Sequence, residues 1–364
     1  MRKNSSKKLG VLFLSFVGPN YSRSSTVLNY HSDKLDKKYM EVPRGIFRSI
    51  KGIYQNRFEI RSSDCLVVMS PCHFLTPALK LVTRKPIILD AGWPLTDGHI
   101  SRGIKNLRIF RLPLIVAIDL ISFCFADMVL VESEAQAKRV IKFFAVQKSK
   151  IRVQFTGLNE STFTAEPATS KVLLDIRRRI MELGFPLIVL FRGKINRESG
   201  FDTILEAAEI QKDSAIFIFL VGKSDISHEF PRNVITVYDV TDNEMQEIYK
   251  LSDISLGQIS THRRLRYTIP HKAFEAGFFS MPYITASSAG VQEYLPHGSA
   301  LFLDKPSTES LVDAIEVMKN SDERKMYAKK MGLNYDKNAS QEVLSKNLDK
   351  ILLELCDPKA NKSS

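Results

Sequence analysis

The stretch LIVLFRGKINRESGFDTILEA, Leu187–Ala207, decides the fold of this chain. Its first five residues form a continuous apolar run, as expected of a strand that is buried on both faces. A loop with three basic residues follows and ends at Gly200. The residues after that glycine recur at the spacing of one helix face: Phe201, Ile204, Leu205 and Ala208. A buried strand followed by a helix is the unit from which parallel sheets are built.

This unit repeats along the whole chain. Apolar runs in the second half predict six strands: Leu187–Phe191, Ile216–Val221, Val234–Tyr238, Ile254–Gly257, Tyr283–Thr285 and Ala300–Leu303. Five more are predicted in the first half: Val11–Phe16, Cys65–Met69, Pro86–Leu89, Met128–Glu132 and Ile151–Phe155. Helical periods separate them, for example Ile46–Tyr54, Phe74–Leu81 and Ala135–Phe144. The pattern predicts an α/β fold with doubly wound, Rossmann-like parallel sheets.

The 364 residues are too many for one ordinary core, so we expect two domains. The polar segment Thr164–Ser170 is the expected linker. We assign residues 1–165 to an N-terminal domain and 166–340 to a C-terminal domain, facing each other across a cleft. A helix over about 341–356 is expected to pack back on the N-terminal domain through its apolar leucines.

The composition, 44% hydrophobic and 25% charged, is that of a globular protein. The four cysteines have no metal-ligand spacing, so reduced thiols in a cytoplasmic protein are expected. Leu9–Val17 is expected to form a strand rather than a secretory signal. The apolar run Leu112–Ala126 contains Pro113 and Asp119 and is too short to span a bilayer, so we expect a buried helix.

The net charge of +12 is unevenly distributed. Met1–Glu166 holds 26 basic and 13 acidic residues, whereas the remainder is nearly balanced. Such a field attracts nucleic acid, an anionic membrane or an anionic substrate. No basic-aromatic motif accompanies the charge, so a membrane or an anionic acceptor is favoured over nucleic acid.

Two segments of the second half carry candidate ligand-binding residues. Arg192, Gly193, Lys194 and Arg197 lie between a strand end and a helix start, where backbone N–H groups and cations would complement a diphosphate. A surface loop with stray basic residues is the alternative. In Ile269–Tyr294, the helix start at Pro270 would cradle phosphate while Glu275 accepts hydrogen bonds from ribose hydroxyls. An exposed ion pair between Lys272 and Glu275 is the alternative there.

Candidates in the first half lie after two predicted strands. Asp90 could orient or deprotonate an acceptor hydroxyl, and Trp93 could stack on a sugar, although a turn cap and a packed indole would give the same pattern. His99 is a second candidate acid or base, against a solvated loop histidine. Gly18 and Asn20, after the first strand, could approach a phosphate or acceptor, or simply form a turn.

Together these segments resemble the GT-B-fold glycosyltransferases of family 4. The resemblance rests on Gly200-Phe201-Asp202, Val221-Gly222, Tyr249–Ile254, Pro270–Gly277, Met281-Pro282 and Gly290–Glu293, with a fainter match at Ala126–Ser133 and Thr156–Asn159. It implies sugar transfer from a nucleotide-diphosphate sugar to a hydroxyl of a glycan, in surface polysaccharide or glycoconjugate synthesis. It also implies retention of anomeric configuration without a metal or another cofactor. The positive charge of the N-terminal half favours a lipid-linked acceptor. The protein would then be cytoplasmic, with contact at the inner face of the cytoplasmic membrane.

The resemblance implies individual roles. Glu275 would bind the donor ribose, and Lys194, in place of an arginine, would neutralise the diphosphate. Backbone groups of Thr268–Lys272, including His271, would contact phosphate, and Tyr238 would lie near the base.

The chain departs from the family pattern at Tyr267, where a glutamate is frequent, and at Ser199, where a lysine is usual. It also has no histidine close to the strand that ends in Asp90. Two alternatives stay open. The same fold can support an epimerase or hydrolase of nucleotide sugars, and Tyr267 and Ser199 argue for a nucleotide-sugar-binding protein that has lost catalysis.

Overall fold

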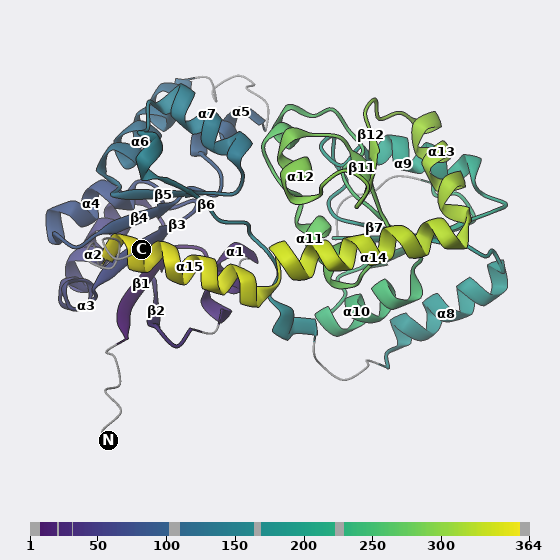
Figure 1. Cartoon of the computed structure of the whole chain (residues 1–364), viewed down its shortest axis with the longest axis horizontal. Helices are drawn as coiled ribbons and strands as arrows, with labels where there is room; N and C mark the ends of the chain where they lie inside the picture. The colour runs from purple at the N-terminus through teal and green to yellow at the C-terminus, as the bar shows by residue number, and fades with distance from the viewer. Residues whose placement is uncertain are drawn as a thin grey trace. The chain divides into compact units, whose positions relative to one another are not determined.

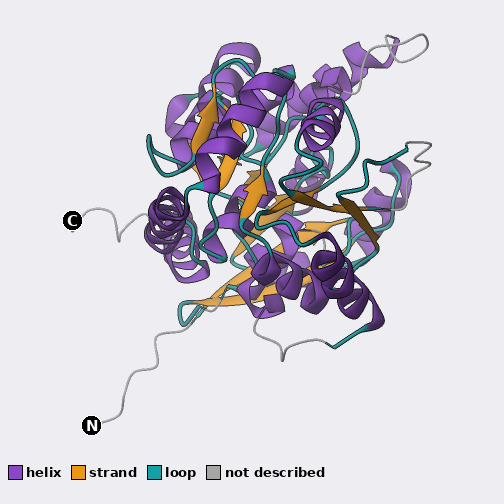
Figure 2. Ribbon diagram, turned by 90° about the vertical axis from the view of Figure 1, so that its right-hand side faces the viewer, coloured by secondary structure: helices purple, strands orange, loops and turns teal. Residues whose placement is uncertain are grey.

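The computed structural model describes residues 8–19, 22–30, 32–101, 110–163, 169–222 and 229–356. The chain forms two compact units, one of residues 1–157 and 341–364 and one of residues 158–340. Each unit is built on a six-stranded parallel sheet that lies between helices (Figures 1 and 2). Most of the predicted linker, residues 164–168, lies outside the described residues.

The first sheet has the strand order β2-β1-β3-β4-β5-β6. Its strands are β1 (Leu9–Ser15), β2 (Leu35–Glu41), β3 (Cys65–Met69), β4 (Ile87–Asp90), β5 (Met128–Val131) and β6 (Ile151–Val153). The five strands expected in this half are all present. β2 was not predicted, because its sequence LDKKYME is polar at most positions. It pairs with β1 alone, so it is an edge strand that has few buried positions to fill.

Alternate residues of the central strands point to opposite faces of this sheet. On one face Leu12, Leu66 and Leu89 pack against α2, α3, α4, α6 and α7. These helices are α2 (Ile46–Gln55), α3 (Arg57–Ser62), α4 (Leu75–Val82), α6 (Leu112–Phe125) and α7 (Glu134–Phe144). The first unit also contains α1 (Ser22–Asn29) and α5 (Leu95–Ser101).

The opposite face of the first sheet is covered by the end of the chain. Val11, Val67 and Leu130 lie in one core with the helix α15 (Gln341–Cys356). The α15 side chains in this core are Leu344, Leu348, Ile351 and Leu352. In Figure 1 α15, in yellow, crosses the sheet of the first unit. The last stretch of sequence therefore completes the core of the first unit.

The expectation of a buried helix over Leu112–Ala126 is wrong in one respect. The helix α6 is present, but its outward side chains Leu114, Leu120, Ile121 and Phe125 are exposed. One side of α6 suffices to cover the sheet, and the apolar residues on its other side are not covered by any part of the chain that the structure describes. In the described part of the chain no helix combines the length and apolar character that a membrane span needs.

The second sheet has the strand order β12-β11-β10-β7-β8-β9. Its strands are β7 (Ile188–Arg192), β8 (Ile216–Val221), β9 (Val234–Tyr238), β10 (Ile254–Leu256), β11 (Tyr283–Ala286) and β12 (Leu301–Leu303). All six strands expected here are therefore present. Every pairing is parallel, so the strands all end at one edge, where the loops with the candidate residues begin.

The helices of the second unit follow the expected apolar stripes. They are α8 (Lys171–Leu183), α9 (Phe201–Ile210), α10 (Asp242–Leu251), α11 (His271–Phe278), α12 (Ala289–Tyr294), α13 (Thr308–Lys319) and α14 (Ser321–Asn338). Phe201 and Ile204 of α9 share a core with Leu311 and Ile315 of α13. At the start of α10, Thr241 and Glu244 form the capping box that the sequence predicts.

Candidate functional site

A buried carboxylate lies at the edge of the second sheet where its strands end. Glu275 of α11 is fully buried, and its Oε1 lies 2.6 Å from the guanidinium of Arg192, the last residue of β7. The Tyr249 hydroxyl donates to Oε2 at 2.7 Å, and Nδ1 of His271 lies 3.0 Å from Oε1. The exposed Lys272–Glu275 pair considered from the sequence is not formed, because the Glu275 carboxylate faces Arg192 instead.

This environment keeps Glu275 ionised. Burial alone would raise the pKa of the Glu275 carboxyl, but Arg192, His271 and Tyr249 outweigh burial and lower that pKa to about 2. Burial and the neighbouring carboxylate raise the pKa of Tyr249 well above its usual value, so its hydroxyl remains a donor. The structure therefore holds a permanent negative charge in place before any ligand is present. An ionised carboxylate is a strong acceptor for hydroxyl groups.

A second buried charge lies one helical turn away. Only 6% of Lys272 is exposed, its Nζ donates to the Gly257 carbonyl at 2.9 Å, and the same nitrogen lies 4.4 Å from the centre of the Phe191 ring. Burial lowers the pKa of Lys272 to about 7, although Glu275 acts in the opposite sense. Gly193 has a φ of 148°, a backbone conformation in which a side chain would be strained. It also lies next to this ammonium group, since a β-carbon there would lie 3.6 Å from Lys272 Nζ. A diphosphate next to Lys272 would raise its pKa again.

The loop from Gly193 to Gly200 presents further cations. The side chains of Lys194 and Arg197 are exposed at this edge of the sheet. Ser199 is buried, and its hydroxyl donates to the carbonyl of Asn196 at 2.7 Å. Ser199 thus holds the loop together, whereas a lysine at this position could point out of it. Tyr238, at the end of β9, exposes 40% of its surface at the same edge of the sheet.

An arginine-rich turn beside this loop was not recognised in the sequence. The short helix η4 (Arg263–Arg266) contains three arginines, and Arg264 donates to the Glu198 carboxylate at 3.1 Å. That bond joins η4 to the loop after β7, while Arg263 and Arg266 remain exposed. The run RRLR, ending nine residues before Glu275, was the available signal. Its position depends on a contact 66 residues apart in sequence, which no local pattern reveals.

Helix starts complete this edge of the second sheet. α9 begins after Gly200 and α11 begins after Pro270, so both present unpaired backbone N–H groups beside the cations. α12 begins after Ser288, whose hydroxyl accepts from the Val291 N–H. A β-carbon on Gly290 would lie 2.8 Å from the backbone carbon of Tyr267, so this glycine permits close packing of α12 against the loop after η4.

In the first unit Asp90 is not open to solvent. Its carboxylate accepts from Nε of Arg23 at 2.7 Å, and the two side chains are 2% and 8% exposed. Arg23 also donates to Thr156 at 2.9 Å and to the Gln154 carbonyl at 3.2 Å. Arg23 was missed because the pair joins residues 67 positions apart. Asp90 therefore fixes a buried arginine at the carboxyl end of β4.

The other first-unit candidates lie close to Asp90 in sequence or at the end of β1. The Trp93 ring packs 3.1 Å from the position of a β-carbon on Gly98, in α5, and His99 lies in the same helix. Gly18 lies in the turn after β1, and no described atom lies within 4 Å of a β-carbon built on it. Asn20 lies outside the described residues.

A buried pair that the sequence did not suggest, His73 with Asp119, holds the start of α5. His73 Nδ1 lies 2.8 Å from Asp119, which also accepts from the backbone N–H of Thr96 at 2.8 Å. His73 follows β3, whereas the family histidine sought in the sequence would follow β4.

The chemistry of the second-unit site is that of anion binding beside a fixed carboxylate. Arg192, Lys194, Lys272 and the η4 arginines supply positive charge, and Glu275 supplies the acceptor. Within the described ranges, no three His, Cys, Asp or Glu side chains are grouped closely enough to hold a metal ion. The sequence model of the family described as Glycosyl transferases group 1 matches residues 176–351 of this chain.

That stretch is therefore similar to the glycosyl transferases group 1 family. The resemblance inferred from the sequence motifs is therefore confirmed. Among curated proteins none matches this sequence.

Solved structures of glycosyltransferases share the fold of the whole chain. Anabaena Alr3699/HepE in complex with UDP-glucose superposes with a TM-score of 0.71 at 12% identity, over 95% of this chain and 100% of that one. Sucrose-phosphate synthase from Thermosynechococcus elongatus gives a TM-score of 0.70 at 14% identity, over 96% and 99%. A Listeria monocytogenes structure described as a UDP-N-acetylglucosamine 2-epimerase gives 0.59 at 11% identity, over 96% of each chain. The predicted GT-B fold, two Rossmann-like units, is confirmed.

Proposed function

We propose that this protein transfers a sugar from a nucleotide-diphosphate sugar to a hydroxyl of a glycan or lipid-linked acceptor. The observation that carries the proposal is the Glu275 carboxylate, ionised and fully buried beside Arg192 at the carboxyl ends of the strands. Ligands of open parallel sheets bind at this edge. The complex of Alr3699/HepE with UDP-glucose supports a donor of this class, because that protein shares the fold.

In this proposal Glu275 accepts a hydrogen bond from a ribose hydroxyl. Its two oxygens are already in contact with Arg192, His271 and Tyr249. A ribose must therefore approach from the side where Arg192 and His271 are partly exposed. Arg192 or His271 would then share Oε1 with the ribose hydroxyl or move away from it. Tyr249 is fully buried and continues to hold Oε2. The donor base would lie near Tyr238.

The diphosphate would be held by cations and helix starts. Lys194 follows Gly193 in the chain, and the Lys272 Nζ lies 3.6 Å from the position of a β-carbon on Gly193. The N-terminus of α11 adds backbone donors. When the bond between the anomeric carbon and the phosphate oxygen breaks, the nucleoside diphosphate leaves with the bonding electrons, and these cations stabilise the added charge. We propose that this stabilisation makes a metal unnecessary, so a chelator should leave the rate unchanged.

The finer points of the proposal concern product and pathway. We infer that transfer retains the anomeric configuration, as the family resemblance implies, and that the product belongs to a surface polysaccharide or glycoconjugate. NMR of the anomeric proton in the product would report the configuration. An inverted product would contradict retention and leave the donor site intact.

The first experiment is a calorimetric screen of UDP-, GDP-, ADP- and CMP-sugars against the wild type, Glu275→Gln and a control, Glu309→Gln. Glu309 is an exposed glutamate of α13, outside the candidate site. One nucleotide should bind the wild type and the control and lose roughly tenfold to a hundredfold in affinity with Glu275→Gln, because a hydrogen bond to a charged group is worth about 1.5–3 kcal/mol. Equal affinity in all three proteins would contradict the role of Glu275.

A product assay with the nucleotide sugar that binds in this screen separates the alternatives. Free sugar or an epimer formed without an acceptor would identify a hydrolase or an epimerase. Nucleotide binding without turnover of any donor would identify a binding protein, and Tyr267 and Ser199 would then be the positions to restore.

A further inference from the structure

The helix α2 of the first unit has its bulky apolar residues on the outside. Its buried residues are Ser49, Gly52 and Ile53, and a β-carbon on Gly52 would lie 2.9 Å from the Pro43 ring. The exposed side carries Ile46, Phe47, Ile50 and Tyr54, and Phe47 is 88% exposed. A surface helix of a globular protein ordinarily buries its larger apolar residues. α2 does the reverse, which indicates that its outer side has another partner.

The apolar surface continues onto the neighbouring helices. Phe58 of α3 is 71% exposed and Leu81, near the end of α4, is 90% exposed. Single exposed apolar side chains are ordinary, whereas several within a short stretch mark an interaction surface. We define the α2–α3 surface as Ile46, Phe47, Ile50, Tyr54, Phe58 and Leu81. In Figure 1 α2, α3 and α4 lie next to one another in the first unit.

The charge around this surface is strongly positive. Residues 44–61 contain five arginines and lysines and one acidic residue, Glu59. The Arg57 guanidinium lies 4.6 Å from the centre of the Tyr54 ring and 4.7 Å from that of Phe58. Cations are therefore interleaved with the exposed rings. A helix that combines a bulky apolar side with basic residues is typical of binding at a lipid–water interface.

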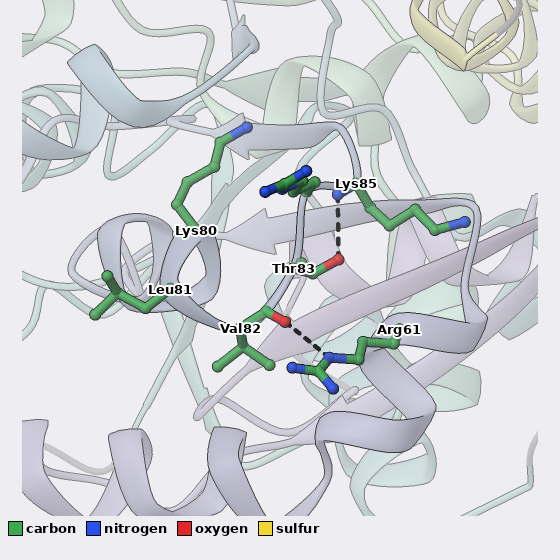
Figure 3. Close-up of a pocket in the computed structure, with 7 residues that line it drawn as sticks. Arg61, Lys80, Leu81, Val82, Thr83 and Lys85 are labelled. Atoms are coloured by element: carbon green, nitrogen blue, oxygen red, sulfur yellow. Dashed lines mark hydrogen bonds between the residues drawn. The ribbon is translucent and has the colours of Figure 1, made fainter.

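A basic pocket of about 500 Å³ adjoins the α2–α3 surface. It is lined by Arg61, near the end of α3, and by Lys80–Lys85, which run from the last turn of α4 into the loop before β4 (Figure 3). The two sides of the pocket are joined, because Nε of Arg61 donates to the Val82 carbonyl at 3.0 Å. Four of the seven lining residues are cations, as expected of a site for a phosphate group.

Two of these cations have carboxylate partners. Lys80 donates to Asp127 at 2.5 Å and Lys85 lies 4.0 Å from Asp64. Each carboxylate also accepts a backbone N–H, that of Ile87 for Asp127 and that of Gly10 for Asp64. Arg61 and Arg84 have no carboxylate partner among the described residues. The pocket therefore keeps a net positive charge that an external anion can neutralise.

The pocket lies at the opposite edge of the first sheet from Asp90. Thr83–Lys85 lie just before β4, separated from it by Pro86, and Asp90 is the last residue of that strand. Arg61 likewise lies a few residues before β3 begins at Cys65. A partner bound in the pocket would thus leave the carboxyl edge of this sheet accessible.

We propose that the α2–α3 surface docks on an anionic lipid bilayer, with headgroup phosphates in the basic pocket and the exposed aromatic and aliphatic side chains at the acyl boundary. A second copy of the chain fits less well, because a twofold interface would place this positive surface against itself. Nucleic acid would account for the cations but not for Ile46, Ile50 and Leu81. The bilayer accounts for both.

This inference goes beyond the proposed sugar transfer, and its observations lie in the first unit alone. The test is co-flotation of the full chain with vesicles of phosphatidylglycerol and phosphatidylcholine in equal parts, compared with vesicles of phosphatidylcholine only. We expect binding to the anionic vesicles that weakens with added salt, because screening reduces attraction to the surface. If the folded wild-type protein does not float with the anionic vesicles, the proposal is wrong.

Two double variants locate the contact. Phe47→Ser with Phe58→Ser and Arg61→Gln with Arg84→Gln change exposed side chains, so the fold should be kept, which thermal unfolding verifies. Each pair should lower the partition coefficient by about tenfold or more, since one cation near an anionic surface or one buried aromatic ring each contribute severalfold. The matched controls are Met181→Ser with Leu333→Ser, and Lys325→Gln with Lys329→Gln, all exposed in the second unit. Controls should bind vesicles as the wild type does.

Three results would contradict this assignment. They are vesicle binding by both surface variants equal to that of the wild type, a wild-type dimer that Phe47→Ser with Phe58→Ser dissociates, or displacement of the vesicles by duplex DNA at equal charge. Donor binding measured in the same samples separates the two proposals. Vesicle binding without donor binding would count against sugar transfer alone, and the reverse would count against docking alone.

Discussion

Gly200 and Ile259 approach each other so closely that a β-carbon on Gly200 would stand 1.8 Å from the Ile259 carbonyl oxygen. Gly200 also has a φ of 69°, in the left-handed region. The contact joins the loop after β7, which carries Lys194, to the loop after β10, which leads to η4. The Ile259 N–H completes it by donating to the Ser199 carbonyl at 2.9 Å. This glycine is thus what allows the two cation-bearing loops to meet.

Gly200→Ala should therefore destabilise the protein and weaken donor binding together. We expect a loss of more than about 2 kcal/mol in the free energy of unfolding, because the clash adds to the backbone strain. Gly184→Ala is the matched control. Its φ is 66°, but its nearest neighbour is 4.0 Å away, so strain acts alone and costs about 1 kcal/mol. Chemical denaturation of both variants checks this, and equal losses would contradict the contact.

Lys272 should take up a proton when the donor binds. Its pKa is about 7 in the free protein, and a diphosphate nearby favours the charged form. Affinity should therefore be highest below about pH 7 and fall as pH rises above it, by at most tenfold per pH unit. Calorimetry with an intact nucleotide sugar in buffers of different ionisation enthalpy measures the proton directly. Lys272→Met should bind without proton uptake, and uptake that persists in this variant would assign the proton to another group.

Glu275 should make stability depend on pH on the acid side. Its pKa is about 2 in the folded protein and about 4.3 in an unfolded chain. The stabilisation is thus present above about pH 4.3 and is lost as pH falls towards 2. Glu275→Gln lacks it at every pH, so the melting temperatures of variant and wild type should converge on acidification. A gap that stays constant from neutral to acid pH would contradict the ion pair with Arg192.

Asp90 should prove structural when it is replaced. Asp90→Ala leaves the Arg23 charge buried without its partner, which typically costs about 3–5 kcal/mol. Replacing both residues, as Arg23→Met with Asp90→Leu, should recover much of that loss. Thermal unfolding of the single and double variants tests the pair. If Asp90 instead acts on an acceptor, Asp90→Ala will abolish transfer and leave the melting temperature unchanged.

The fold could be predicted from the sequence because its strands are buried on both faces. Runs such as Ile216–Val221 are apolar at every position, so strands of this kind could be predicted from composition alone. β2 was missed because an edge strand places half its residues in water. The exposed side of α6 was missed for the opposite reason, since its sequence is apolar all round and the pattern indicates no solvent side.

The site could be predicted only where its residues follow one another along the chain. Arg192 and Glu275 were both found as candidates, but from separate segments. Their pairing, and the part played by Tyr249, depend on strand order, which brings β7 and β10 together across more than sixty residues. Arg23 and the η4 arginines were missed for the same reason. Local patterns show which residues can bind an anion. Which of these residues already form an ion pair within the protein depends on tertiary contacts.

The return of α15 to the first unit has a consequence for synthesis on the ribosome. The face of the first sheet that carries Val11 and Val67 is covered in part by Val27 of α1, and its cover is completed only when Leu344–Leu352 have been made. By then every residue of the second unit has been translated, so the second sheet can close first. The first half of the gene therefore encodes the unit that matures last. A nascent chain arrested before codon 341 would present apolar surface of this sheet to chaperones. Adding α15 as a separate peptide should cover that surface and reduce chaperone binding.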